Sequence, residues 1–321
     1  MKILLLRLDG KIPNIALMRI AAHCKASGDD VEYRNAATVQ AIQRHLFDNV
    51  DCIYASCIFE KSKPIAMELK RIYPSAIVGG TGWDLTTTLE QYGIITKSQD
   101  YSIYPAWKQS IGFTQRGCRL KCSFCVVPRK EGSVRDEQSI NDLWRGDPWP
   151  REIILLDNDF FGQLRWSDRI NELINGKFKV SFNQGINARF LTAETASAIA
   201  SVDYRDDQMK VKRLYTAWDN RRDEDRLFRG LNYLIKYGVK PFHIMVYMLI
   251  GYWPGEIEDD WVYREQKLRE FGCMAYPMPY VRNQSTVGFQ RFAITHYSKH
   301  CSWKDFKTAG YRSPFANTSA V

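Results

Sequence analysis

The first hundred residues alternate between short apolar runs and longer segments in which apolar residues recur every three or four positions. Short apolar runs are typical of buried strands, and a repeat near 3.6 residues is typical of helices with one buried face. We predict strands over residues 2–8, 31–35, 52–59 and 76–80, and helices over 13–28, 38–49 and 64–74. This α/β alternation favours a doubly wound parallel sheet of the Rossmann or flavodoxin-like kind over residues 1–103.

The same alternation resumes after a link at residues 101–110 and continues to about residue 281. One helix, predicted over 223–238, carries an apolar stripe formed by Leu227, Leu231, Leu234 and Ile235. Strands are predicted over residues 111–114, 152–157, 178–183, 213–218, 241–250 and 273–281, and another helix over 167–177. Six strand–helix units favour a partial (β/α)6 TIM-like barrel over residues 104–285, with its chemistry on the loops that follow the strands.

Residues 286–321 are predicted to form a C-terminal extension that packs on the barrel and ends in a frayed tail. The segment 282–307 mixes aromatic and basic residues. It is interpreted either as an amphipathic helix closing one side of the barrel or as a surface that binds nucleic acid.

Composition places the chain among globular proteins. Of its 321 residues, 45% are hydrophobic and 25% are charged. The apolar stretches are too short to span a bilayer, and the N-terminal run is too short for a signal peptide, so we expect a cytoplasmic protein with no membrane contact. The formal net charge of +9 favours an anionic partner, such as a nucleotide or nucleic acid, or else serves solubility.

Three of the eight cysteines lie within eight positions. Cys118, Cys122 and Cys125 are spaced C-x3-C-x2-C, with Phe124 directly before the third. A structural zinc site needs four ligands, and disulfides need an even number, so three thiols indicate a metal centre with one open position. A [4Fe–4S] cluster held by three thiolates would have such a position on one iron.

The three cysteines also fit a zinc site completed by His296, His300 or Cys301, or a chance grouping. Neither alternative is closed by the spacing. The five remaining cysteines are predicted to be core residues of a protein in a reducing compartment. They are Cys24, Cys52, Cys57, Cys273 and Cys301.

The segment "CRLKCSFC" resembles the cysteine motif of the radical S-adenosylmethionine (radical SAM) superfamily, and the chain is similar to short, largely uncharacterised members, some from phage genomes. The resemblance implies that the open iron binds S-adenosylmethionine. An electron from the cluster then yields methionine and a 5′-deoxyadenosyl radical, which abstracts hydrogen from a substrate. That substrate is unidentified, with anionic, nucleotide-like and nucleic-acid compounds as candidates. An electron donor such as flavodoxin or ferredoxin is also implied, and no catalytic side chain is assigned.

Further segments resemble the superfamily members that carry a cobalamin-binding-like domain at the N-terminus. The resemblance implies cofactor contacts at strand ends and beside the cluster, whereas ordinary turns and solvated loops are the alternative for each. The implied contacts are Phe124, Asp157, Asn158, Asp159, Gln184, Arg189 and Asp219. The turn at Gly251, Pro254, Gly255 and Glu256 resembles the family's Gly-x-Pro-Gly-Glu turn but is one residue longer.

The first loop disfavours cobalamin without excluding it. Cobalamin domains with a protein axial ligand read Asp-x-His-x-x-Gly there, whereas this chain has Lys11 in the histidine position, and a protonated lysine has no lone pair for cobalt. Gly79, Gly80 and Gly82 either admit a cofactor tail or form a tight turn. Two alternative functions follow: a cobalamin-dependent radical SAM methyltransferase, and a non-catalytic, metal-stabilised nucleic-acid-binding protein.

Overall fold

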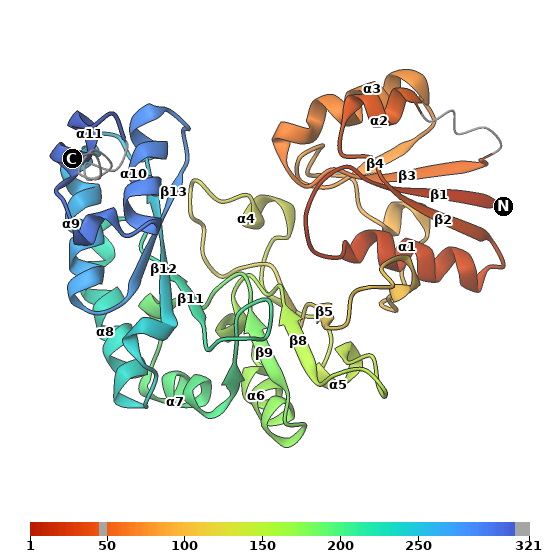
Figure 1. The fold of residues 1–321 in the computed structure, drawn as a ribbon. Coiled ribbons are helices and arrows are strands. Elements are labelled where there is room, and N and C mark those ends of the chain that lie inside the picture. The colour runs from red at the N-terminus through yellow and green to blue at the C-terminus, as the bar shows by residue number, and fades with distance from the viewer. Residues whose placement is uncertain (45–49, 312–321) are drawn as a thin grey trace, which may run out of the picture. The chain divides into compact units, whose positions relative to one another are not determined.

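The computed structural model describes residues 1–44 and 50–311, which form two compact units (Figure 1). Met1–Ile111 and Cys125–Gly132 make up the first unit, and Gly112–Phe124 and the chain from Ser133 onward make up the second. The predicted boundary at 103/104 therefore lies inside the first unit, and the one at 285/286 lies inside the second.

A four-stranded parallel sheet forms the middle of the first unit, with the strand order β2-β1-β3-β4. Its elements are β1 (Lys2–Arg7), α1 (Ile15–Ala26), β2 (Asp30–Asn35), α2 (Val39–Arg44), β3 (Cys52–Ser56), α3 (Lys63–Ile72) and β4 (Ile77–Gly79). Leu4 and Leu6 pack in the core shared with α2 and α3, whereas Ile3 and Leu5 pack in the core shared with α1. Helices on both faces of the sheet confirm the predicted doubly wound arrangement.

Local signals set the helix ends in this unit. The side chain of Asn14 accepts a hydrogen bond from the Leu17 N–H and caps α1, and Gly28 turns the chain with a φ of 82°. The described part of the helix predicted over 38–49 is α2, and residues 45–49 lie outside the described residues. The unit also contains the short helices η1 (Glu60–Ser62), η2 (Glu90–Tyr92), η3 (Tyr101–Ile103) and α4 (Val127–Lys130).

The second unit contains two further sheets, with the orders β10-β9-β8-β5 and β11-β12-β13, and β5 begins in the last two residues of the Met1–Ile111 segment of the first unit. The strands are β5 (Ser110–Gly112), β8 (Glu152–Leu155), β9 (Lys179–Phe182), β10 (Asp203–Tyr204), β11 (Leu214–Ala217), β12 (Ile244–Ile250) and β13 (Met274–Pro279). Neighbours from β8 to β10 and from β11 to β13 pair in parallel. All six strands predicted for this region are present, in a mixed α/β arrangement with parallel sheets.

The sequence pattern did not predict three short strands of the second unit. They are β10 and the antiparallel pair β6 (Gln115–Arg116) and β7 (Arg135–Asp136), which flanks the cysteine segment. The two larger sheets meet where the Ile186 N–H donates to the Tyr215 carbonyl at 2.7 Å.

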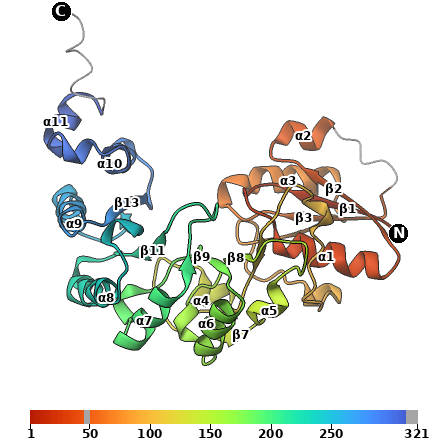
Figure 2. The same cartoon turned by 60° about the horizontal axis from the view of Figure 1, so that its bottom comes forward.

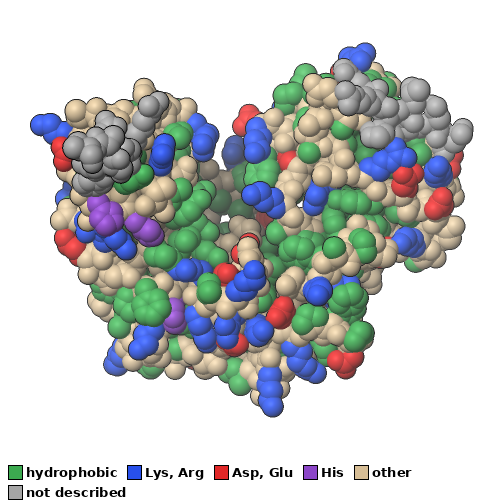
Figure 3. Space-filling model, in the orientation of Figure 1, with side chains coloured by type: hydrophobic (Ala, Val, Ile, Leu, Met, Phe, Trp, Pro, Cys, Tyr) green, Lys and Arg blue, Asp and Glu red, His purple; other side chains and the backbone are tan. Residues whose placement is uncertain are grey.

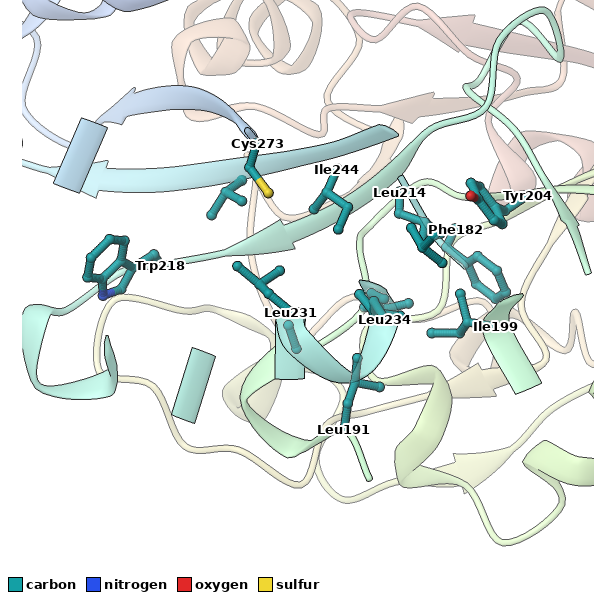
Figure 4. Close-up of a cluster of buried hydrophobic side chains, with 14 of the residues drawn as sticks. Phe182, Leu191, Ile199, Tyr204, Leu214, Trp218, Leu231, Leu234, Ile244 and Cys273 are labelled. Carbon is teal, nitrogen blue, oxygen red and sulfur yellow. The ribbon is translucent and has the colours of Figure 1, made fainter. Parts of the chain in front are cut away.

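Helices cover one side of these strands, and α6, α7 and α8 follow one another in chain order (Figure 2). The helical segments are α5 (Ile140–Leu143), η4 (Phe160–Gly162), α6 (Trp166–Asn175), η5 (Ala188–Phe190), α7 (Ala193–Ser201), η6 (Arg221–Asp223), α8 (Glu224–Lys236), η7 (Pro241–His243) and α9 (Glu258–Glu270). Leu231 and Leu234 of α8 face Leu214 and Ile244 of the strands (Figure 4). The predicted apolar stripe of α8 is thus confirmed as part of the core.

The C-terminal segment packs its aromatic residues inward. It contains α10 (Gln284–Ile294), η8 (Tyr297–Lys299) and α11 (Trp303–Thr308). Phe289, Phe292, Trp303 and Phe306 are buried in the core of the second unit, so their rings cannot stack on nucleic-acid bases. The predicted frayed tail falls on residues 312–321, outside the described residues.

Among the described helices, none combines the length and the apolar character that crossing a lipid bilayer requires.

Candidate metal centre and strand-end site

The cysteine segment leaves β6 at Arg116 and turns at Gly117, whose φ of 77° favours glycine. Cys118, Cys122 and Cys125 are partly exposed thiols outside any disulfide, and the Leu120 N–H donates to the Cys118 sulfur at 3.4 Å. Thiols of this kind are accessible to a metal or cluster.

The described residues contain no group of three or more His, Cys, Asp or Glu side chains arranged to hold a metal ion. This applies equally to the cysteine triplet and to the zinc alternative with His296, His300 or Cys301. The chemistry of the donors fits a thiolate-ligated cluster.

The other five cysteines differ from the triplet. Cys24, Cys57 and Cys273 are buried, and burial raises the pKa of Cys57 to about 11 and that of Cys273 to about 12. Cys52 and Cys301 pack partly against the cores. The assignment as core residues is confirmed for Cys24, Cys57 and Cys273, whereas Cys52 and Cys301 are only partly buried.

Asp157 ties the end of β8 to the chain that leads into the cysteine segment. Its carboxylate accepts hydrogen bonds from the Thr114 N–H at 2.7 Å, the Gln115 N–H at 3.2 Å and the Thr114 hydroxyl. The side chain is 3% exposed, and burial raises its pKa to about 7 although the hydrogen bonds oppose the shift. Asp157 therefore fixes the approach to Cys118 through backbone contacts.

Gln115 makes a second connection between the end of β8 and the cysteine segment, and the sequence pattern did not predict it. Its fully buried amide donates to the Gly117 carbonyl at 2.6 Å and to the Arg116 carbonyl at 2.7 Å, and its oxygen accepts from the Asp159 N–H at 3.0 Å. One feature of the sequence could have indicated this role: Gln115 is a polar residue beside a predicted strand and directly before Arg-Gly-Cys.

Asp159 joins the same loop to the cysteine segment through an ion pair. Its Oδ2 accepts from Arg119 Nε at 2.9 Å and from the Arg119 N–H at 3.3 Å. Burial raises the pKa of Asp159, while the Arg119 charge opposes the rise. The Arg119 guanidinium also lies 5.3 Å from the Phe190 ring centroid, beyond the end of β9. Asn158, between the two aspartates, is partly exposed.

Arg189 lies after β9 and close enough to the cysteine segment to interact with it electrostatically. It pairs with Asp223 at 2.7 Å and donates to Asn187 at 3.1 Å. Burial alone would lower the pKa of Arg189, but Asp223 and the charges of Asp219 and Cys122 raise it. Gln184, the other predicted contact in this loop, is exposed.

Arg264 of α9 joins the ends of β11 and β12. Its guanidinium donates to the Trp218 carbonyl at 2.8 Å, to the Leu249 carbonyl at 3.0 Å and to Glu256 at 2.6 Å. Glu256 also accepts from the Gly251 N–H at 2.7 Å, which closes the turn over residues 251–256. Two backbone carbonyls and a carboxylate thereby share one buried cation.

Asp219 follows β11 beside this cation. Burial raises the pKa of its carboxyl, while the charges of Arg189 and Arg264 oppose the rise. The Trp253 indole N–H donates to the Asp219 carbonyl at 2.7 Å, so the loops after β11 and β12 are bonded to each other. Asp219 thus lies at a strand end near two guanidinium groups.

An aromatic cluster connects the cysteine segment to the ends of β12 and β13. The Phe124 ring meets Tyr252 edge to face at 5.5 Å and Trp253 at 6.3 Å, and Tyr252 meets Tyr280 at 4.7 Å. The sequence pattern indicated Phe124 but not its two ring partners, Tyr252 and Trp253, nor Tyr280, which contacts Tyr252. The extra residues Tyr252 and Trp253 in the lengthened turn were the available signal.

The first unit uses its glycines for backbone packing. Added side chains at Gly80 and Gly82 would place Cβ 2.3 Å from the Cys57 carbonyl oxygen and 2.4 Å from Phe59 backbone atoms. The Asp9 carboxylate, at the end of β1, accepts from the backbone N–H groups of Ile58 and Phe59. These contacts explain both glycines without a cofactor tail.

Lys and Arg side chains are distributed over the visible face of both units, among acidic and hydrophobic side chains (Figure 3). Phe124, Asp157, Asn158, Asp159, Gln184, Arg189 and Asp219 remain predicted cofactor contacts. Comparisons of the chain with protein-family models, curated proteins and solved structures find no match.

Proposed function

We propose that this protein is a radical SAM enzyme, in which Cys118, Cys122 and Cys125 hold a [4Fe–4S] cluster. The observation that carries the proposal is a set of three accessible thiols within eight residues, on a segment anchored to the ends of parallel strands. Bound there, the cluster and S-adenosylmethionine would supply a 5′-deoxyadenosyl radical that abstracts hydrogen from a substrate.

The surrounding side chains support this chemistry. Arg119 and Arg189 place two cations by the cysteine segment, which would offset the negative charge of a thiolate-ligated cluster. Asp219 and Arg189 offer a carboxyl and a guanidinium for the polar groups of the cofactor. The rings of Phe124, Tyr252 and Trp253 would exclude water from one side. The two parallel sheets of the second unit would form the partial (β/α)6 barrel that carries these loops.

The alternatives have less support. A cobalamin-dependent methyltransferase needs a cofactor site in the first unit, where the strand-end loops bond to each other. A nucleic-acid-binding protein would need exposed rings in segment 282–307, and its large aromatic residues Phe289, Phe292, Trp303 and Phe306 are buried.

The test is anaerobic reconstitution with iron and sulfide, followed by dithionite and S-adenosylmethionine. The proposal expects release of 5′-deoxyadenosine by the wild type and none by C118S, C122S or C125S. The matched control is C301S, a partly exposed cysteine outside the triplet, which should retain activity. A preparation that holds its cluster and releases no 5′-deoxyadenosine would refute the proposal, as would purification with zinc in place of iron.

A further inference from the structure

Three tyrosines lie side by side on the β11-β12-β13 sheet. Tyr215, Tyr247 and Tyr276 come from successive strands, and Tyr247 and Tyr276 are partners in the strand register. The Tyr215 and Tyr247 rings are parallel within 3°, with centroids 5.8 Å apart. Tyr247 meets Tyr276 edge to face at 5.7 Å. We name these three residues the tyrosine row.

The tyrosine row occupies the face of the sheet opposite the helices. Leu214, Ile244 and Val246 point into the core with α8, and side chains alternate along a strand, so Tyr215 and Tyr247 point the other way. All three tyrosines are partly exposed. Within the described part of the chain, none of their hydroxyls makes a hydrogen bond to another residue. The tyrosine row therefore offers a ligand aromatic rings to stack on, and hydroxyl donors that no other described residue uses.

The side chains next to the row on the same strands and the same side are mostly apolar and include Met245 and Met274. One cation, Arg213, lies beside them and donates to the Met274 sulfur at 3.2 Å. Burial, together with the neighbouring tyrosine, raises the pKa of Tyr215 to about 12 and also raises that of Tyr247, so both hydroxyls stay protonated near neutral pH. Asp206 and Asp207 also raise the pKa of Tyr215 while Arg213 lowers it, so the two carboxylates outnumber the one cation near this residue.

We infer that the tyrosine row binds the substrate of the proposed radical enzyme through an uncharged planar ring that carries hydrogen-bond acceptors. A planar ring stacks on a tyrosine face whatever its substituents, and neutral hydroxyls donate to acceptors on its edge. Any anionic part of the substrate would have to bind elsewhere, for example at the strand-end arginines. This inference rests on the proposed function for the role of the bound ring as substrate.

The position of the row agrees with that role. Tyr247 pairs with Ala217, two residues before Asp219 at the end of β11. Two strand residues correspond to about 7 Å. A ring on Tyr247 would thus lie close to the strand ends that carry the proposed cofactor contacts.

The experiment measures binding of matched planar and saturated probes to the full chain by saturation-transfer NMR and calorimetry. S-adenosylmethionine is left out of these measurements, because its adenine is itself a planar ring with hydrogen-bond acceptors and would compete with the probes. The pairs are uridine with 5,6-dihydrouridine, thymidine with its 5,6-dihydro form, and phenol with cyclohexanol. At least one planar probe should bind about 10-fold more tightly than its saturated partner.

Substitutions in the tyrosine row test whether the preferred planar probe binds there. Y247L and Y215L should weaken its binding about 10-fold, because they remove a stacking face. Y247F keeps the ring and loses one donor, so a loss of about 3-fold is expected. The control is Y237L, which changes an exposed tyrosine at the end of α8. If Y247L does not fold, Y247F and Y276L decide the matter.

Two outcomes would overturn the inference: no planar probe preferred over its saturated partner, or a preference that all row variants retain. If no planar probe is preferred but 5′-deoxyadenosine is still released, this inference is wrong and the proposed function stands. If a planar probe is preferred but no 5′-deoxyadenosine is released, the proposed function is wrong and the tyrosine row remains a ring-binding site.

Discussion

The Arg119 guanidinium lies 2.9 Å from the Asp159 carboxylate, which is 2% exposed, and this ion pair joins the cysteine segment to the end of β8. The two residues are forty positions apart in the chain, so the pair forms only when the second unit folds. Together with the hydrogen bonds of Gln115 and Asp157, this ion pair fixes the backbone conformation of the polar cysteine segment.

Replacing Arg119 with alanine should destabilise the protein by about 1–2 kcal/mol. The substitution leaves a buried carboxylate with only its backbone partner, and the cost is moderate because the Arg119 side chain is 38% exposed. Urea unfolding measures the change. R165A is the matched control, since the Arg165–Asp168 pair is mostly exposed and should contribute nothing measurable. Equal losses in the two variants would contradict the anchoring role of Arg119.

Gly162 leaves space for Asp159, and G162A should disturb it. A Cβ at this position would lie 2.4 Å from Asp159 Oδ2 and 2.8 Å from its Cγ. Since Asp159 is held by Arg119, we expect a loss of about 1–3 kcal/mol in the free energy of unfolding. The control G79A places a Cβ at an ordinary 3.5 Å from Thr87. An unaffected G162A protein would mean that Asp159 moves aside without cost.

Asp157 should make the stability of the protein depend on pH. Its pKa is raised to about 7 by burial, so the folded state holds the proton more tightly than the unfolded state, whose aspartate titrates near 4. The contribution of this group to stability is present below about pH 4 and is lost as the pH rises toward 7. D157N lacks this loss. Its free energy of unfolding relative to wild type should therefore rise by about 2–4 kcal/mol between pH 4 and pH 8, measured by urea titration. If the difference in the free energy of unfolding between D157N and wild type does not change with pH, the pKa of Asp157 is not raised.

Arg264 should be among the most sensitive positions. Its side chain is 1% exposed and that of Glu256 is 6% exposed, so R264M leaves a buried carboxylate and two carbonyls without their donor. We expect a loss of about 3–5 kcal/mol in the free energy of unfolding, measured by urea titration. R221M is the control, because the Arg221–Asp260 pair is half exposed. A similar small loss in both variants would show that the buried cation does not hold the strand ends.

Regular alternation made most of the fold predictable. The strands and the apolar stripe of α8 follow from local patterns, and so does the doubly wound first sheet. The strands β6, β7 and β10 were not predicted, because each has only two residues and so short a segment shows no periodic pattern. The separation of the second unit into two sheets was also not predicted, since pairing between strands depends on residues far apart in the chain.

The candidate site was predictable only where a motif is local. The cysteine triplet is visible within eight residues, whereas the bond between Arg264 and the carbonyls of Trp218 and Leu249 spans up to 46 positions. Strand-end carboxylates look alike in sequence, so nothing there distinguishes Asp157, which holds backbone N–H groups, from Asp219, which lies near two guanidinium groups. The aromatic residues of segment 282–307 fitted two interpretations, and the burial of Phe289, Phe292, Trp303 and Phe306 supports the one in which they pack on the second unit.

The most direct measurement is the electron paramagnetic resonance spectrum of the anaerobically reconstituted and reduced protein, recorded before and after S-adenosylmethionine is added. An open iron bound to three cysteines predicts a [4Fe–4S]⁺ signal that changes when the ligand is added, and that is absent from C118S, C122S and C125S. A protein with no such signal, or with a signal that S-adenosylmethionine leaves unchanged, would contradict the account.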